Sequence, residues 1–269
     1  MSNFMKLSVF ATGLLATTAL SQAADLYEPP IVEVVPEVRT IHTGGWYLRG
    51  DVGYAHSAVD GVEYYQGTPT LTGSFERHDL GDAWSLGGGI GYQVTDYFRA
   101  DVTLDHQFDA DFTGSSASGV ACAAVVPGGG GTCSYNDNSS LAITTLMANG
   151  YLDLGNYSGF TPYVGAGIGG AMVHWSDVSN TEYEDADPAN SVTSTHGGNG
   201  EWRFAYALHA GVSYDISSNM KLDAGYTFKH IEGGEMFDFE SGNANSGAQG
   251  FDDDIKVHTV RAGIRWSLH

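Results

Sequence analysis

The side chains that could do acid–base or metal chemistry in this 269-residue chain are ten histidines and 32 acidic residues. No two histidines have the spacing of a zinc site with a third ligand nearby. His56 precedes Ser57 and His78 precedes Asp79, but adjacency in sequence does not provide the hydrogen-bonded geometry that activates a nucleophile. We therefore predict no catalytic residue, no cofactor and no enzymatic activity. A lipid hydrolase or acyltransferase is the last of three functional hypotheses.

One acidic run could bind a metal. The consecutive residues Asp252, Asp253 and Asp254 offer the hard oxygen ligands that Ca²⁺ and Mg²⁺ prefer. Their spacing is not that of a dedicated cation loop, so a solvated acidic run is the favoured interpretation. We predict no metal site and name these three aspartates as the candidates to test.

The two cysteines, Cys122 and Cys133, flank the turn-forming run that begins at Pro127 and continues through four glycines. In an exported protein, an even pair of cysteines around such a turn predicts a disulfide that closes a surface loop. Closing so short a loop removes about 3 kcal/mol of chain entropy or less. The disulfide would therefore hold the loop rather than the fold.

Twelve charged residues alternate with apolar residues in runs that have the pattern of strands. Alternation with a period of two places the charges on one face and the apolar side chains on the other. The twelve are Arg49, Asp51, Arg99, Asp101, Asp105, Asp153, Arg203, Lys221, Asp223, Lys229, Arg261 and Arg265. A strand of this kind suits a barrel that has lipid outside and a charged, filled interior.

The clearest strand is the last one, IKVHTVRAGIRWSL at residues 255–268. Its even positions are mostly apolar, and its odd positions are mostly polar or small. This ending resembles the C-terminal insertion signal of bacterial outer-membrane barrels, with the polar residue Arg261, then Gly263, Trp266 and Leu268 at set spacing. The resemblance implies that the barrel assembly machinery is a partner.

Seven further alternating runs precede this strand, from Trp46 onward. Short turns follow the second, fourth and sixth runs, and long loops follow the others. The sequence therefore predicts an all-β fold, an eight-stranded antiparallel up-and-down transmembrane β-barrel with four long extracellular loops and short periplasmic turns. The fourth run has the least certain register, because apolar residues occupy both faces near Leu141 and Ile143. A soluble β-sandwich is the alternative fold.

Aromatic residues fall at both ends of the predicted strands, as expected of residues at the two membrane interfaces. We place Trp84, Phe108, Trp175, Trp202 and Phe228 in a girdle at the loop end, and Trp46, Phe98, Tyr214 and Trp266 in a girdle at the turn end.

The N-terminal region predicts export. Residues 1–23 have the basic start, apolar core and small-residue end of a cleaved signal peptide. Residues 24–45 form a proline- and glutamate-rich periplasmic lead-in, and residues 46–268 form the barrel. The predicted location is the outer membrane of a Gram-negative bacterium.

Four segments, AADLYEPP, GGWYLRGDVGY, FTPYVGAGIG and RAGIRWSL, together resemble the small outer-membrane β-barrel family of alphaproteobacteria, the RopB-like surface antigens of rhizobia and brucellae. The resemblance covers nearly the whole mature chain. It implies the barrel architecture, with roles that range over surface antigens, porin-like proteins, adhesins and haemin binders.

The interior of an eight-stranded barrel is just wide enough for side chains to fill it. We therefore predict that the twelve inward charges form ion pairs across the lumen, because an unpaired buried charge costs several kcal/mol. The alternative is a narrow, low-conductance porin-like channel that passes the inward glycines Gly87, Gly89, Gly91, Gly165, Gly167 and Gly169.

The predicted outer loops carry 21 of the 32 acidic residues, with Arg77 the only base beside them. Such a surface would repel nucleic acid. It could contact anionic lipopolysaccharide and other outer-membrane lipids through divalent cations. The leading hypothesis is a non-enzymatic outer-membrane barrel that supports envelope integrity and displays acidic loops, as an adhesin or surface antigen. Nothing in the sequence defines an oligomeric state.

Overall fold

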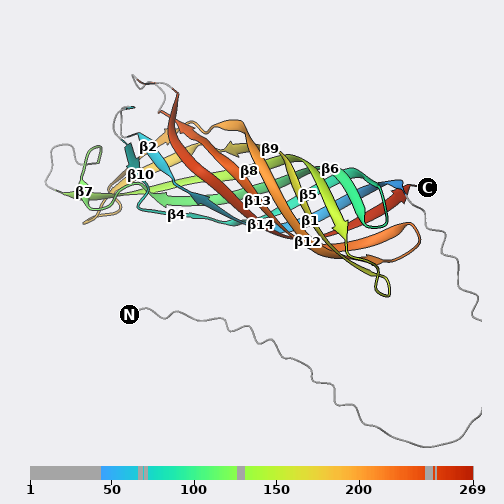
Figure 1. The fold of residues 1–269 in the computed structure, drawn as a ribbon. Coiled ribbons are helices and arrows are strands. Elements are labelled where there is room, and N and C mark those ends of the chain that lie inside the picture. Colours follow the sequence, from blue (N-terminus) through green and yellow to red (C-terminus); the bar gives the residue numbers. More distant parts are fainter. Residues whose placement is uncertain are drawn as a thin grey trace, which may run out of the picture. The chain divides into compact units, whose positions relative to one another are not determined.

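A closed ring of eight strands is the main feature of the computed structural model, which describes residues 44–65, 69, 72–125, 131–239, 245 and 247–268. The ring strands are β1 (Gly45–Asp60), β5 (Asp82–Gln93), β6 (Phe98–Ser115), β8 (Thr132–Asp153), β9 (Phe160–Trp175), β12 (Gly200–Asp215), β13 (Met220–Asp238) and β14 (Ala248–Leu268). Each pairs antiparallel with its neighbours in the chain, and β1 pairs with β14 to close the ring. The strands run side by side and are tilted relative to the long axis of the barrel (Figure 1).

The register of the ring follows from the pairing. Starting at His56 and stepping from each residue to its paired residue on the next strand, one circuit ends at Trp46, ten positions earlier on β1 (56 minus 46). This offset tilts the strands relative to the barrel axis, as closure of a sheet requires.

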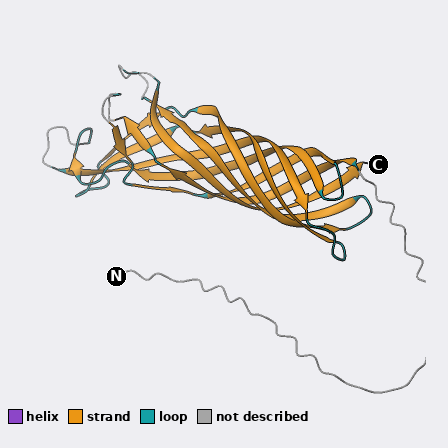
Figure 2. Cartoon of the chain, in the orientation of Figure 1, coloured by secondary structure: helices purple, strands orange, loops and turns teal. Residues whose placement is uncertain are grey.

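The two faces of the ring strands differ as the alternation predicts. Outward residues are apolar and exposed, for example Leu86, Ile168 and Val260, whose exposed fractions are 60%, 61% and 68%. Inward residues such as Tyr47, Arg99 and Thr145 are buried. Figure 2 shows strands and loops only, and no helix within the described residues is long and apolar enough to span a membrane.

Short turns close one end of the barrel after β5, β8 and β12, as predicted. Thr95 begins the first, where its Oγ1 atom accepts hydrogen bonds from the backbone nitrogens of Tyr97 and Phe98 at 3.3 and 3.0 Å. In the second, Gly155 and Gly159 have φ values of 95° and 92°, a conformation that favours glycine. Because the turns are so short, the described residues form no further strands beyond the ring at this end.

The opposite end extends well beyond the turns. The short strands there are β2 (Glu63–Tyr65), β3 (Thr72–Ser74), β4 (Arg77–Leu80), β7 (Val120–Ala121), β10 (Val178–Glu184) and β11 (Ser191–His196). The strand β10 pairs with residues 133–138 of β8, at the loop end, and β11 pairs with β10. A hairpin therefore continues the barrel wall at the loop end.

One girdle assignment is wrong. Trp175 was placed among the lipid-facing aromatics, but it lies inside the barrel with 0% of its surface exposed. It shares its parity with the inward residues Val173 and Tyr163 on β9, so the alternation outweighs its position at the strand end. Trp84 and Trp202 do face outward, each 61% exposed.

The uncertain register of the fourth run is resolved by Leu141 and Ile143. Both point inward and are buried, on the same face as Thr145. The predicted signal peptide and the lead-in up to residue 43 lie outside the described residues.

Candidate functional site

The inward charges form several clusters, the first of which is built around Arg49. Its guanidinium contacts the carboxylates of Asp51 at 2.8 Å and Asp101 at 3.0 Å. Arg49 also donates to the Tyr151 hydroxyl at 3.0 Å, and the Tyr47 hydroxyl donates to Asp101 at 3.0 Å. All five groups are buried, so hydrogen bonds and opposite charge together compensate for the loss of water.

A second cluster centres on Arg99, whose exposed fraction is 1%. Its Nε atom donates to Asp153 Oδ1 at 3.1 Å. The guanidinium carbon lies 4.1 Å from the ring centre of Tyr151 and 4.7 Å from that of Tyr163. A cation held over aromatic faces gains further electrostatic attraction away from water.

A third cluster joins the last two ring strands to β12. Arg265 donates to Ser213 Oγ at 2.7 Å and pairs with Asp223 at 3.2 Å, and Ser213 in turn donates to Asp223. Arg261 lies 3.8 Å from Asp51 of the first cluster.

The remaining predicted charges have partners that the sequence did not identify. Lys229 donates to Thr145 Oγ1 at 3.2 Å, and Asp105 lines the same small cavity as Lys229. Lys221 pairs with Asp215, the last residue of β12. Of the twelve residues, the structure therefore gathers most but not all into ion pairs.

Arg203 lies apart from the other bases and pairs with one of the metal candidates. Its Nη1 atom is 2.7 Å from both carboxylate oxygens of Asp252, and its Nε atom is 3.0 Å from Glu201. Burial raises the pKa of Asp252 to about 6, and Arg203 opposes that rise.

The other two metal candidates point elsewhere. Asp253 is exposed, and Asp254 pairs with Lys256 at 3.4 Å. Asp252, in contrast, is buried against Arg203. The structure does not bring the three carboxylates around one ion.

An apolar plug fills the barrel toward its loop end, and the sequence did not predict it. Every ring strand contributes inward residues to this plug. Its largest fully buried members are Phe112, Leu141, Ile143, Val173, Trp175, Ile231, Met236, Ile255 and Val257. Phe112 contacts Trp175 and Phe75 edge-on, at ring-centre distances of 5.5 and 5.8 Å.

The lumen below the plug is almost filled. A polar cavity of about 30 Å³ remains, lined among others by Asp105, Asn149, His209, Lys229 and Arg261. Such a volume holds only a few water molecules. The ion pairs and the plug together therefore close the passage through the barrel.

A larger cavity, of about 610 Å³, lies at the loop end. Phe75, Val178 and Phe237 of the plug contribute to its wall, together with Tyr64 and Tyr135. This cavity is therefore a recess on the loop-end side of the plug.

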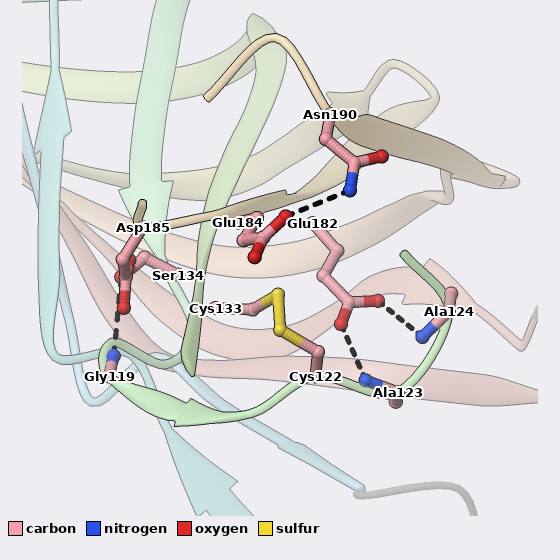
Figure 3. Close-up of a disulfide and its surroundings, with 10 residues drawn as sticks. All are labelled: Gly119, Cys122, Ala123, Ala124, Cys133, Ser134, Glu182, Glu184, Asp185 and Asn190. Carbon is pink, nitrogen blue, oxygen red and sulfur yellow. Dashed lines mark hydrogen bonds between the residues drawn. A yellow bond between two sulfur atoms is a disulfide. The ribbon is translucent and has the colours of Figure 1, made fainter. Parts of the chain in front are cut away.

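The two cysteines form the predicted cross-link at the same end. Cys122 and Cys133 are joined by a disulfide, and the Glu182 carboxylate beside it accepts hydrogen bonds from the backbone nitrogens of Ala123 and Ala124 at 2.6 and 2.8 Å (Figure 3). The sulfur atoms lie close to Glu182, but they are bonded to each other and are not free thiolates. The disulfide and Glu182 together hold residues 122–124, which follow β7.

A closed ring of eight antiparallel strands, with an apolar outer belt and a filled lumen, defines a small transmembrane β-barrel of the outer-membrane type. The sequence agrees, because residues 10–267 match the family described as the outer membrane protein beta-barrel domain. The chain belongs to this family and is an outer-membrane protein. This confirms the predicted fold class and location.

Individual relatives extend the comparison. An uncharacterised protein of Brucella abortus (strain 2308) is 34% identical, covering 97% of this chain and 98% of its own length. A Rickettsia bellii protein named as a candidate adhesin is 26% identical, covering 83% of this chain and 88% of its own. Among solved structures, Neisserial surface protein A covers 83% of this chain and 97% of its own, with 15% identity and a TM-score of 0.42.

Proposed function

We propose that this chain is a non-enzymatic surface protein of the outer membrane that contacts lipopolysaccharide through divalent cations and presents its extracellular end for adhesion. The observation that carries the proposal is the closed lumen. With a cavity of about 30 Å³ below an apolar plug, the described part of the barrel offers no wide path for a solute. Its interactions must then involve its outer wall and its loop end.

The charges at the loop end favour contact mediated by cations. Asp109, Asp111 and Glu232 are exposed, and within the described residues none of the three is in an ion pair. Carboxylates at the membrane border would repel lipid phosphates unless a divalent cation lies between them, and oxygen atoms are the ligands that Mg²⁺ and Ca²⁺ prefer.

Adhesion is supported by the shape of the loop end. The hairpin of β10 and β11 pairs with the loop end of β8 and continues the wall there, and the disulfide with Glu182 holds residues 122–124. A rigid projection of this kind loses little conformational freedom on binding. The Rickettsia bellii relative is named as a candidate adhesin, which agrees with this proposal.

The test measures binding of the folded barrel to purified lipopolysaccharide, with Mg²⁺ and with EDTA. We expect Mg²⁺ to strengthen binding to the wild type and to strengthen it much less when Asp109, Asp111 and Glu232 are replaced by Asn, Asn and Gln. The matched control replaces the exposed acids Glu63, Asp79 and Asp187 in the same way and should behave as the wild type. Equal binding with Mg²⁺ and EDTA would refute cation bridging.

The channel hypothesis requires a continuous wet path, and the apolar plug opposes it. An enzyme would need a general base beside a nucleophile. His56, one of the histidines considered for that role, instead contacts Asp82 at 2.7 Å on the outer face.

A further inference from the structure

The recess at the loop end has the size of a small-molecule site. Its volume of about 610 Å³ lies within the range of about 300–1,000 Å³ that is usual for pockets that bind small molecules. Its residues come from strands far apart in the sequence, among them β2 and β10, which lie at the same end of the barrel (Figure 1). We call this cavity the loop-end recess.

Aromatic side chains form much of the wall of the loop-end recess. Phe75 contacts Tyr64 edge-on, with ring centres 5.4 Å apart, and Phe237 contacts the His196 imidazole at 5.8 Å. All four residues line the recess, as does Tyr135, and both phenylalanines are buried. Rings of this kind pack against the apolar body of a ligand, and their faces attract a cation.

One carboxylate in the same wall is held only by neutral groups. Asp137 of β8 is 2% exposed. Its Oδ2 atom accepts a hydrogen bond from the backbone nitrogen of Ser116 at 2.7 Å, and its Oδ1 atom accepts one from Asn180 Nδ2 at 2.5 Å. These donors orient the carboxylate but do not neutralise its charge. An ionised carboxylate can accept about four hydrogen bonds, so Asp137 retains the capacity for another donor.

The other buried carboxylates of the barrel are held differently. Seven acidic residues are buried within the described part of the chain, and five of them pair with an arginine, namely Asp51, Asp101, Asp153, Asp223 and Asp252. The sixth, Glu182, accepts hydrogen bonds from two backbone nitrogens beside the disulfide. Asp137 is the seventh, and it is the one that lines the loop-end recess.

The barrel provides no lysine or arginine in the loop-end recess. Neither residue type is among the described residues that line it. Neither occurs in the segments between 44 and 268 that lie outside the described residues, which are 66–68, 70–71, 126–130, 240–244 and 246. A buried charge without an opposite charge beside it is costly, and a cationic ligand in the recess would offset that cost.

Two further polar atoms in this wall have no hydrogen-bond partner among the described residues. Gln249 is 9% exposed, and its Nε2 atom donates to the Tyr65 carbonyl oxygen at 2.8 Å, but its Oε1 atom is unpartnered. The buried Nδ1 atom of His196 is also unpartnered. Buried polar atoms are normally hydrogen-bonded. Because the Gln249 Oε1 atom is an acceptor, it indicates a ligand that donates hydrogen bonds.

We propose that the loop-end recess binds a small primary amine that carries an apolar body. The ammonium group pairs with Asp137, the N–H groups of the ligand serve the unpartnered acceptors of the same wall, and the apolar body packs against Phe75 and Phe237. An ammonium group supplies both a positive charge and three N–H donors, whereas the wall offers a negative charge and acceptors. The inference does not depend on the proposed contact with lipopolysaccharide, which involves the outer wall of the barrel.

The experiment measures binding of tryptamine to the full-length folded barrel in detergent by isothermal titration calorimetry. Two matched probes accompany it. Tryptophol carries a hydroxyl in place of the amine, and the trimethylammonium form of tryptamine keeps the charge but has no N–H donor on that group. We expect tryptamine to bind about tenfold more tightly than either probe, because it alone offers both the charge and the donors.

Variants locate the binding site. Asp137→Asn keeps the shape of the side chain and should abolish the preference for tryptamine over tryptophol, and Gln249→Met should weaken tryptamine binding about fivefold. Asp185→Asn is the matched control and should bind as the wild type does, because Asp185 is an exposed acid of the same end that does not line the recess. Gln249→Met serves if Asp137→Asn does not fold by circular dichroism.

Salt separates this site from a general attraction of cations to a chain with a net charge of −21. Raising the salt concentration from about 0.05 to about 0.5 M should change the affinity little, since a buried pair is screened much less than exposed charges. Absence of tryptamine binding, its loss at the higher salt, or equal binding of tryptamine and either matched probe would overturn the proposal. A preference that persists in the folded Asp137→Asn variant, or undiminished binding to the folded Gln249→Met variant, would overturn it as well.

Discussion

Replacing Trp175 with Ala tests whether the apolar plug holds the barrel closed. The side chain is fully buried and contacts Phe112 edge-on at 5.5 Å. An aromatic side chain buries about 150–250 Å², which at about 25 cal/mol per Å² corresponds to about 4–6 kcal/mol. Because the Trp175 indole N–H has no hydrogen-bond partner among the described residues, no hydrogen bond is added to this value. We expect Trp175→Ala to lower the free energy of unfolding by about 3–5 kcal/mol.

The assay is urea-induced unfolding in lipid vesicles, followed by circular dichroism so that loss of a tryptophan does not affect the signal. Trp202→Ala is the matched control, since the same ring there faces outward and is 61% exposed. It should cost less, because lipid fills the space left by the ring and no internal cavity forms. Equal losses in the two variants would refute the inward placement of Trp175 and with it the plug.

Other variants test the strand register, the ion pairs and the disulfide. Ile264→Arg should reduce insertion into vesicles, because it places a charge in lipid at a cost of about 2–4 kcal/mol. Arg265→Lys keeps an inward charge and should fold. The opposite result would show that the outward and inward faces of β14 are exchanged. Arg265→Gln should cost about 3–5 kcal/mol in urea unfolding by leaving Asp223 buried without its partner, and adding Asp223→Asn should recover most of that loss; additive losses would argue against the pair. Reducing the Cys122–Cys133 disulfide should speed proteolysis of that loop without changing the heat-modifiable migration of the barrel in SDS, because the cross-link contributes about 3 kcal/mol or less; a shift to the unfolded band would show that it holds the fold.

Much of the architecture could be predicted because a strand with lipid on one side and a filled lumen on the other has a strict period of two. This pattern located all eight ring strands, the three short turns and the inward faces. It also identified the bases Arg49, Arg99 and Arg265 as inward, because a charge on the opposite face would lie in lipid. The pattern says which face a residue occupies, but not which residue lies opposite.

For that reason the sequence predicted neither the apolar plug nor the partners of the inward charges. Leu141 and Ile143 are apolar and inward, so composition alone could not separate a plug from the lipid-facing belt. Trp175 was assigned by its position at a strand end, although its parity with Val173 indicated the interior. The partner of Arg203 comes from β14, two strands away around the ring, a distance that only the closed register defines.

The measurement that tests the central claim most directly is the conductance of the purified wild-type barrel in planar lipid bilayers. The lumen contains the pairs made by Arg49 and Arg99, a cavity of about 30 Å³ and the apolar plug around Trp175. We predict that folded, inserted protein gives no reproducible current steps above the bare membrane, under conditions in which a general porin gives clear ones. Reproducible ion-conducting steps from the wild type would contradict a closed barrel and favour a channel.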